Sequence, residues 1–153
     1  MDIYTVSFFG HRELKNPFNA EAKLEEIIRD LLNNNSYVEF LVGRDGLFDQ
    51  LVSSTIRRIS KEYNYGNSEL ILVLPYMKSE YRKNTESFEA YYDCIEICEK
   101  AAHSHFKAAI QIRNRWMVDR SDLVVCCIEH KSGGAYQTIK YAEKQEKKIH
   151  NII

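Results

Sequence analysis

Apolar runs typical of buried strands alternate along the chain with segments of helical spacing. The strand-like runs are rich in β-branched and aromatic residues, and they occupy 3–10, 37–43, 69–76, 92–98, 122–130 and 148–153. Between them, apolar residues recur every three to four positions, which predicts helices over 19–35, 47–63, 104–121 and 134–148. We expect Asn19 to cap the first helix and the polar, irregular segment 77–90 to form a loop.

Strands that alternate with helices favour right-handed crossovers and an α/β fold. We therefore predict one domain over residues 1–153, with a mostly parallel sheet of five to six strands covered by helices on both sides. Ligands of such sheets bind outside the carboxyl ends of the strands. The loops after strands 3–10, 37–43, 69–76 and 122–130 should thus share one cleft.

Composition narrows the class of protein further. The formal net charge is −1, with 28% charged and 44% hydrophobic residues, so nothing global attracts nucleic acid or a membrane. No apolar run approaches the roughly 18 residues that span a bilayer, and the first apolar run lacks the basic flank of a signal peptide. Four cysteines without histidines at metal spacing indicate reduced thiols. We expect a cytoplasmic protein without a metal or cofactor.

The segment Ser132-Gly133-Gly134 lies between a buried strand and a helix. Glycines there let backbone N–H groups face a ligand, and a helix N-terminus favours a phosphate. Ser132 can cap the helix or donate to the anion. The segment therefore predicts a phosphate-binding loop, with a plain tight turn as the alternative.

The loop Gly43-Arg44-Asp45-Gly46 has the same strand–glycine–helix layout. It lacks the Lys-Ser/Thr pair of a Walker loop and is not a complete G-x-G-x-x-G fingerprint. Asp45 and Asp49 either stabilise the start of the following helix or hold ribose hydroxyls or a base amino group. They are also the candidate catalytic carboxylates.

Gly10-His11-Arg12 closes the first strand, where Gly10 allows a close approach and Arg12 can pair with a phosphate. His11 can donate to that phosphate or transfer a proton. A solvated loop is the alternative for the His-Arg pair. Arg113 and Asn114, late in the helix 104–121, can reach the same cleft, or Arg113 can pair with Asp119 or another carboxylate.

Tyr76 and Tyr81 follow the strand 69–76. They are the best tyrosine candidates for stacking on a base, because that position places an aromatic ring beside the expected cleft.

Five stretches in order, SFFGHR, VGRDGLFD, VLPY, RNRWMVDRSDLVV and SGGAYQTIKYA, resemble the SLOG superfamily over nearly the whole chain. That superfamily unites the DprA/Smf DNA-processing proteins with the "lonely guy" phosphoribohydrolases, and the chain resembles its small bacterial and phage branch most. The resemblance implies a Rossmann-like fold, a nucleotide-type ligand and often a homodimer. It implies that the site is shaped by Gly10, Arg12, Gly43, Asp45, Gly46, Asp49, Arg113, Asn114, Gly133, Gly134 and Thr138.

The chain departs from the hydrolase pattern P-G-G-x-G-T-x-x-E. Ser132 stands at the proline position, Tyr136 at the third glycine and Lys140 at the glutamate. In this alignment the catalytic acid is missing, and Asp45, Asp49 or Glu129 would have to replace it. DprA-like members bind single-stranded DNA, for which this chain lacks an overall basic excess.

Three functions follow as hypotheses. The first is a domain that binds or senses a nucleotide without turnover, and the second is a nucleoside 5′-monophosphate phosphoribohydrolase or a related N-glycosidic enzyme. The third is a DNA-processing or regulatory partner protein, which makes a nucleic-acid ligand the less expected one. We also predict a homodimer through helix 104–121, where Phe106 and Trp116 supply apolar surface.

Overall fold

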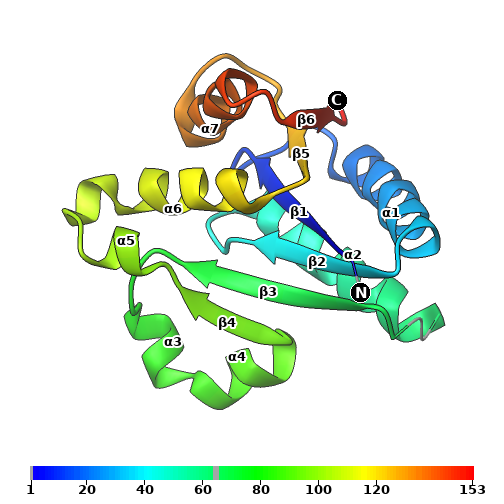
Figure 1. Cartoon of the computed structure of the whole chain (residues 1–153), viewed down its shortest axis with the longest axis horizontal. Coiled ribbons are helices and arrows are strands. Elements are labelled where there is room, and N and C mark those ends of the chain that lie inside the picture. The colour runs from blue at the N-terminus through cyan, green and yellow to red at the C-terminus, as the bar shows by residue number, and fades with distance from the viewer. Residues whose placement is uncertain (1, 64–65) are drawn as a thin grey trace.

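The computed structural model describes residues 2–63 and 66–153. Its centre is one six-stranded parallel sheet in the order β4-β3-β2-β1-β5-β6 (Figure 1). The strands are β1 (Ile3–Gly10), β2 (Tyr37–Val42), β3 (Ser68–Leu74), β4 (Cys94–Ile97), β5 (Leu123–Cys127) and β6 (Lys148–Asn151). All six predicted strands are present, and the predicted three-layer α/β fold is confirmed.

Helices cover both faces of this sheet. One face carries α1 (Pro17–Asn34) and α2 (Leu47–Tyr63), with the short helices α3 (Ser79–Lys83) and α4 (Thr85–Tyr91) beside β4 (Figure 1). The other face carries α5 (Glu99–Ala102), α6 (Phe106–Arg120) and α7 (Gly133–Lys144).

Each strand of the middle of the sheet divides its side chains between the two cores. Phe8 packs with the helices α1 and α2, whereas Phe9 packs on the opposite face with α6 and α7. The neighbouring Cys126 and Cys127 also point to opposite faces of the sheet, as the alternation of side chains along a strand predicts. Burial raises the pKa of Cys126 to about 12 and that of Cys127 to about 11, so both thiols stay protonated at neutral pH.

Two local predictions were wrong. Segment 77–90 is not an irregular loop, because it forms α3 and α4, which are anchored by the buried ring of Phe88. Helix α1 begins at Pro17 and is capped by Asn16, whose Oδ1 accepts from the backbone N–H of Asn19 at 3.1 Å. Proline fits the first turn because its missing N–H would have no partner there.

The strand order places a crevice in the middle of the sheet. From β1, the chain progresses through β2 and β3 to β4, and then returns along α6 to β5 on the other side of β1. The loops that leave β1 and β5 therefore turn to opposite faces and open a gap between them. Among the described residues, none of the helices combines the length and apolarity that a bilayer crossing requires.

Candidate functional site

A cleft of about 520 Å³ lies at the carboxyl ends of β1, β2 and β5, against the side of α6. It brings together these residues expected at the site: Gly10, His11, Arg12, Gly43, Asp45, Gly46, Asp49, Arg113, Asn114, Gly133 and Gly134. Further lining comes from Phe8, Phe9, Glu13, Ile110, Met117, His130 and Ala135. Tyr76, Ser132 and Thr138, also expected at the site, are not among the lining residues.

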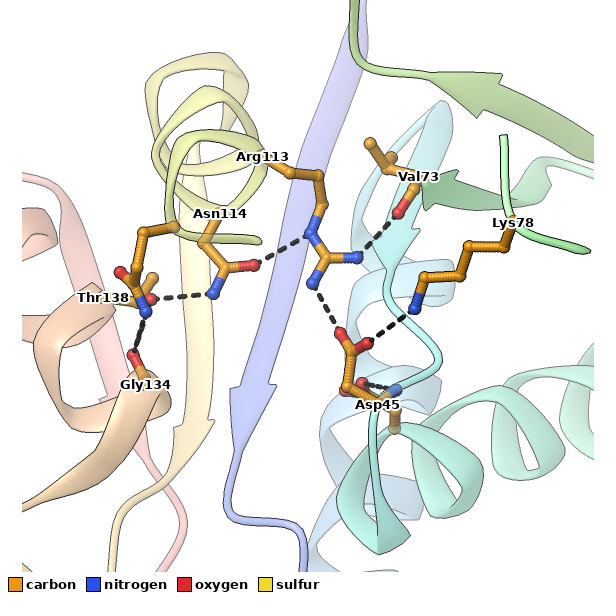
Figure 2. Close-up of polar contacts among 9 residues, drawn as sticks. Asp45, Val73, Lys78, Arg113, Asn114, Gly134 and Thr138 are labelled. Carbon is orange, nitrogen blue, oxygen red and sulfur yellow. Dashed lines mark hydrogen bonds and ion pairs between the residues drawn. The ribbon is translucent and has the colours of Figure 1, made fainter. Parts of the chain in front are cut away.

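The Arg113 guanidinium is fixed by three hydrogen bonds in the wall of the cleft (Figure 2). Its Nη2 donates to Asp45 Oδ2 at 2.5 Å, its Nη1 to the carbonyl of Val73 at 2.9 Å, and its Nε to Asn114 Oδ1 at 3.0 Å. The arginine side chain is 3% exposed. Its partner is thus Asp45 and not Asp119, and a phosphate would have to displace Asp45 to bind this guanidinium.

The same line of contacts continues to the opposite wall (Figure 2). Asn114 Nδ2 donates to Thr138 Oγ1 at 3.0 Å, and that hydroxyl donates to the carbonyl of Gly134 at 2.9 Å. Thr138 is fully buried on the inner side of α7, so it positions the first turn of that helix without facing the cleft. Arg113 and Asn114 therefore tie the β2–α2 loop to the β5–α7 turn.

Two carboxylates with opposite pKa shifts lie side by side in the cleft. Burial raises the pKa of Asp49 to about 6, although its Oδ2 accepts the backbone N–H of Asp45 at 2.8 Å. Burial also acts to raise the pKa of Asp45, but the Arg113 guanidinium and the Lys78 ammonium, 3.4 Å from Oδ1, outweigh it and lower the pKa. Asp45 is thus an anion at neutral pH, whereas Asp49 titrates close to it.

Asp49→Asn should stabilise the protein at pH 7.5 by about 1–2 kcal/mol. The raised pKa means that the wild-type protein loses stability between pH 3.8 and about 6, as the unfolded carboxyl ionises before the folded one. Asparagine removes this loss and keeps an oxygen for the N–H of Asp45. Urea unfolding at pH 4 and 7.5 measures the effect, with the exposed Asp30→Asn as control. An equal gain at both pH values would contradict the assignment.

Two of the cleft glycines are explained by packing. A Cβ built on Gly10 would lie 2.3 Å from Cγ of the buried Phe48 ring, and one on Gly46 would lie 2.5 Å from Cα of Arg12. Both glycines let the β1–α1 and β2–α2 loops approach each other, which shapes the floor of the cleft. A close approach to a ligand, the sequence expectation for Gly10, is not needed to explain them.

The β5–α7 turn is different, because it is open. Gly133 has a backbone φ of +90°, which residues with a Cβ rarely adopt. A Cβ built on Gly133 would meet no atom within 4 Å. Ser132 precedes the helix but does not cap it, since its Oγ is hydrogen-bonded to His130 Nδ1 at 3.0 Å. The N–H groups of the first turn of α7 have no intrahelical acceptor and lie at the cleft.

His11 holds this turn in place. Its Nε2 accepts the backbone N–H groups of Glu129 at 3.1 Å and His130 at 3.3 Å, and its ring stacks on that of His130 at 3.6 Å. Burial and the neighbouring His130 lower its pKa, in spite of the Glu129 carboxylate. Nε2 must be unprotonated to accept these two N–H groups, so the ring is neutral. His11 therefore positions the turn and does not donate to an anion from Nε2.

Arg12 is the exposed cation of the cleft. Among the described residues its guanidinium has no ion-pair partner, in contrast to Arg113 with Asp45 and Arg44 with Glu80 at 2.9 Å. It lines the same cleft as Gly133 and Gly134. Arg12 and the first turn of α7 are thus the groups left free to hold an anion.

Neither Tyr76 nor Tyr81 lines the cleft. Tyr76 packs at the edge of the α6 core, and Tyr81 packs against Phe88, 5.3 Å between ring centroids. Sequence reasoning also missed Lys78, which neutralises Asp45, and His130, which stacks on His11. A lysine in the loop after β3 was a usable signal, since that loop begins at the same edge of the sheet.

The described residues contain no group of three or more His, Cys, Asp or Glu side chains that could hold a metal ion. The carboxylates Asp45 and Asp49 are occupied by one arginine, one lysine and one backbone N–H.

No protein-family model and no curated protein sequence matches the chain. Solved structures of other proteins do match the chain. DNA processing protein A from Helicobacter pylori, in a study of its single-stranded DNA binding mode, superposes with a TM-score of 0.65 at 17% identity over 95% of this chain. The chain shares its fold with DNA processing protein A. The Streptococcus pneumoniae protein gives a TM-score of 0.67 at 14% identity over 96% of the chain.

The likeness is one of fold, because the identities are low. It confirms the DprA-type, Rossmann-like architecture that the resemblance implied. The chain spans 63% of the H. pylori protein and 49% of the S. pneumoniae protein, so both neighbours contain more than this domain.

Proposed function

We propose that the domain binds single-stranded DNA and holds a backbone phosphate in the cleft, between Arg12 and the first turn of α7. The observation that carries the proposal is the open β5–α7 turn. Its residues have no side-chain cap and line the same cleft as Arg12, an exposed arginine without an ion-pair partner among the described residues. A helix N-terminus and a guanidinium both favour a phosphate oxygen. The fold shared with DNA processing protein A, whose H. pylori member binds single-stranded DNA, supports the polymer as ligand.

The proposed contact is small, which suits the balanced charge of the chain. One or two neutralised phosphates give a salt slope of about −0.7 each for single strands. Affinity should therefore fall only about 3- to 7-fold between 50 and 200 mM salt. A net charge of −1 is compatible with such a local contact, whereas a long electrostatic track would need many more cations.

Arg12→Ala should weaken binding of a fluorescein-labelled oligothymidylate by at least about tenfold, since a charged hydrogen bond is worth about 1.5–3 kcal/mol. Fluorescence anisotropy at 50 mM salt measures the dissociation constants. Arg82→Ala is the matched control, because Arg82 is an exposed arginine on α3 that does not line the cleft. If both variants bind as the wild type does, or if the wild type does not bind, the proposal fails.

A free nucleotide is the second candidate ligand. The cleft volume of about 520 Å³ favours it, because it falls in the range of small-molecule sites. Asp49, with its pKa of about 6, adds a group suited to proton transfer. Lys140, at the position of the hydrolase glutamate, is paired with Glu143 and does not line the cleft. A rise in melting temperature with mononucleotides, with chromatography of the products, separates binding from turnover.

A further inference from the structure

Phe106 is an exposed aromatic residue that the fold does not explain. It is the first residue of α6 and is 67% exposed, whereas a phenylalanine is normally buried. The ring of His105 stacks on it, with 5.0 Å between centroids and 25° between planes. His105 is itself held by its Nδ1, which accepts the N–H of Lys107 at 3.2 Å. The pair forms an exposed aromatic surface at the amino end of the helix.

This surface continues the wall of the cleft. Phe106 lies four residues before Ile110, which lies four before Asn114, so the three share one face of α6. Ile110 and Asn114 line the cleft. Gln111 Nε2 donates to the carbonyl of Gly134 at 3.2 Å, which fixes α6 beside the first turn of α7. In Figure 1 the amino end of α6, which begins at Phe106, extends past the carboxyl end of β3, and Phe106 is not among the residues that line the cleft.

The segment around Phe106 has a small basic excess, although the chain as a whole does not. Residues 100–118 contain four Lys or Arg residues and no Asp or Glu, and the acidic residues Glu99 and Asp119 flank them. Arg113 is neutralised by Asp45 and Arg115 lies over the Tyr141 ring. Lys107, which directly follows Phe106, is exposed, as is Lys100 on α5. The amino end of α6 adds its own partial positive charge. An aromatic ring among cations suits a nucleic-acid base next to its phosphate.

We infer that Phe106, backed by His105, stacks on a base of a single-stranded DNA whose neighbouring phosphate lies in the cleft. The inference rests on the proposed function and deepens it, because it gives the strand a direction away from the cleft along α6. Stacking needs a π-face but no base identity, so the subsite should accept any sequence. Lys107 then lies close enough along the helix to neutralise the next phosphate.

The test compares Phe106→Leu with Phe106→Tyr on two oligonucleotides, an oligothymidylate and the same length of strand built from abasic residues. Leucine keeps an apolar side chain but removes the π-face, whereas tyrosine keeps it. We expect Phe106→Leu to bind the oligothymidylate about tenfold more weakly and Phe106→Tyr to bind within about twofold of the wild type. On the abasic strand all three proteins should bind alike. Because residue 106 is exposed, both variants should fold as the wild type does, which urea unfolding checks.

Several outcomes would overturn the inference. Equal binding of the oligothymidylate by the wild type and Phe106→Leu, with the Arg12 effect intact, removes the stacking subsite and leaves the proposed function standing. No binding by the wild type removes both. A loss that persists on the abasic strand, together with a smaller solution mass for Phe106→Leu, makes the surface a contact between copies of the chain.

Discussion

Asp45→Ala should lower the free energy of unfolding by about 3–5 kcal/mol. The Arg113 side chain is 3% exposed, and Asp45 is the carboxylate that neutralises it. Removal of one partner of a buried ion pair leaves an uncompensated charge in the interior, which accounts for the size of the loss. The effect should exceed that of Asp45→Asn, in which an amide oxygen can still accept from Nη2.

Urea unfolding at pH 7.5 measures this change. Asp30→Ala is the control, because Asp30 is an exposed aspartate on α1, and its removal should alter stability by less than about 0.5 kcal/mol. A loss for Asp45→Ala as small as that of the control would mean that the Asp45–Arg113 pair does not hold the β2–α2 loop. The cleft described above would then lack its fixed wall.

Gly10→Ala should cost about 3 kcal/mol, at the upper end of what overpacking produces. The added Cβ would lie 2.3, 2.5 and 2.7 Å from three carbons of Phe48, a ring that is fully buried between β1 and α2. Such a ring has little room to move, so the strain passes to the backbone of β1 or α2.

Gly133→Ala is the comparison variant for Gly10→Ala. Its Cβ would enter open space, so the cost is limited to backbone strain at φ +90°, about 1–2 kcal/mol. In a Phe48→Ala background Gly10→Ala should cost less than in the wild type, because alanine lacks Cγ and Cδ2, the two carbons nearest to the added Cβ. A double-mutant cycle in urea measures this coupling, and purely additive losses would contradict the steric explanation.

The middle of the sheet could be predicted from the sequence because each strand is apolar nearly throughout. Runs such as 37–43 and 69–76 become β2 and β3, and the rule that ligands bind beyond the strand ends led to the loops that form the cleft. Segment 77–90 could not be predicted, since α3 and α4 are too short for a helical period and one buried ring, Phe88, anchors them.

The roles of the site residues were harder to predict than their location. Arg113 and Asp45 are 68 positions apart, and a sequence does not show that their charges cancel. For the same reason Thr138 was expected at the ligand, but it is buried on the inner side of α7 as a hydrogen-bond partner of Asn114. The low overall charge also concealed the basic segment 100–118.

A titration of oligothymidylate into ¹⁵N-labelled protein tests the central claim most directly, because amide shifts locate the phosphate. We predict that the largest changes occur at the amides of Gly133, Gly134 and Ala135, with smaller ones at Gly10 and none at Thr5, at the opposite end of β1. The same titration of Arg12→Ala should need more oligonucleotide to reach the same shifts. Shifts that spare the first turn of α7, or that gather at the amino ends of the strands, would contradict the account.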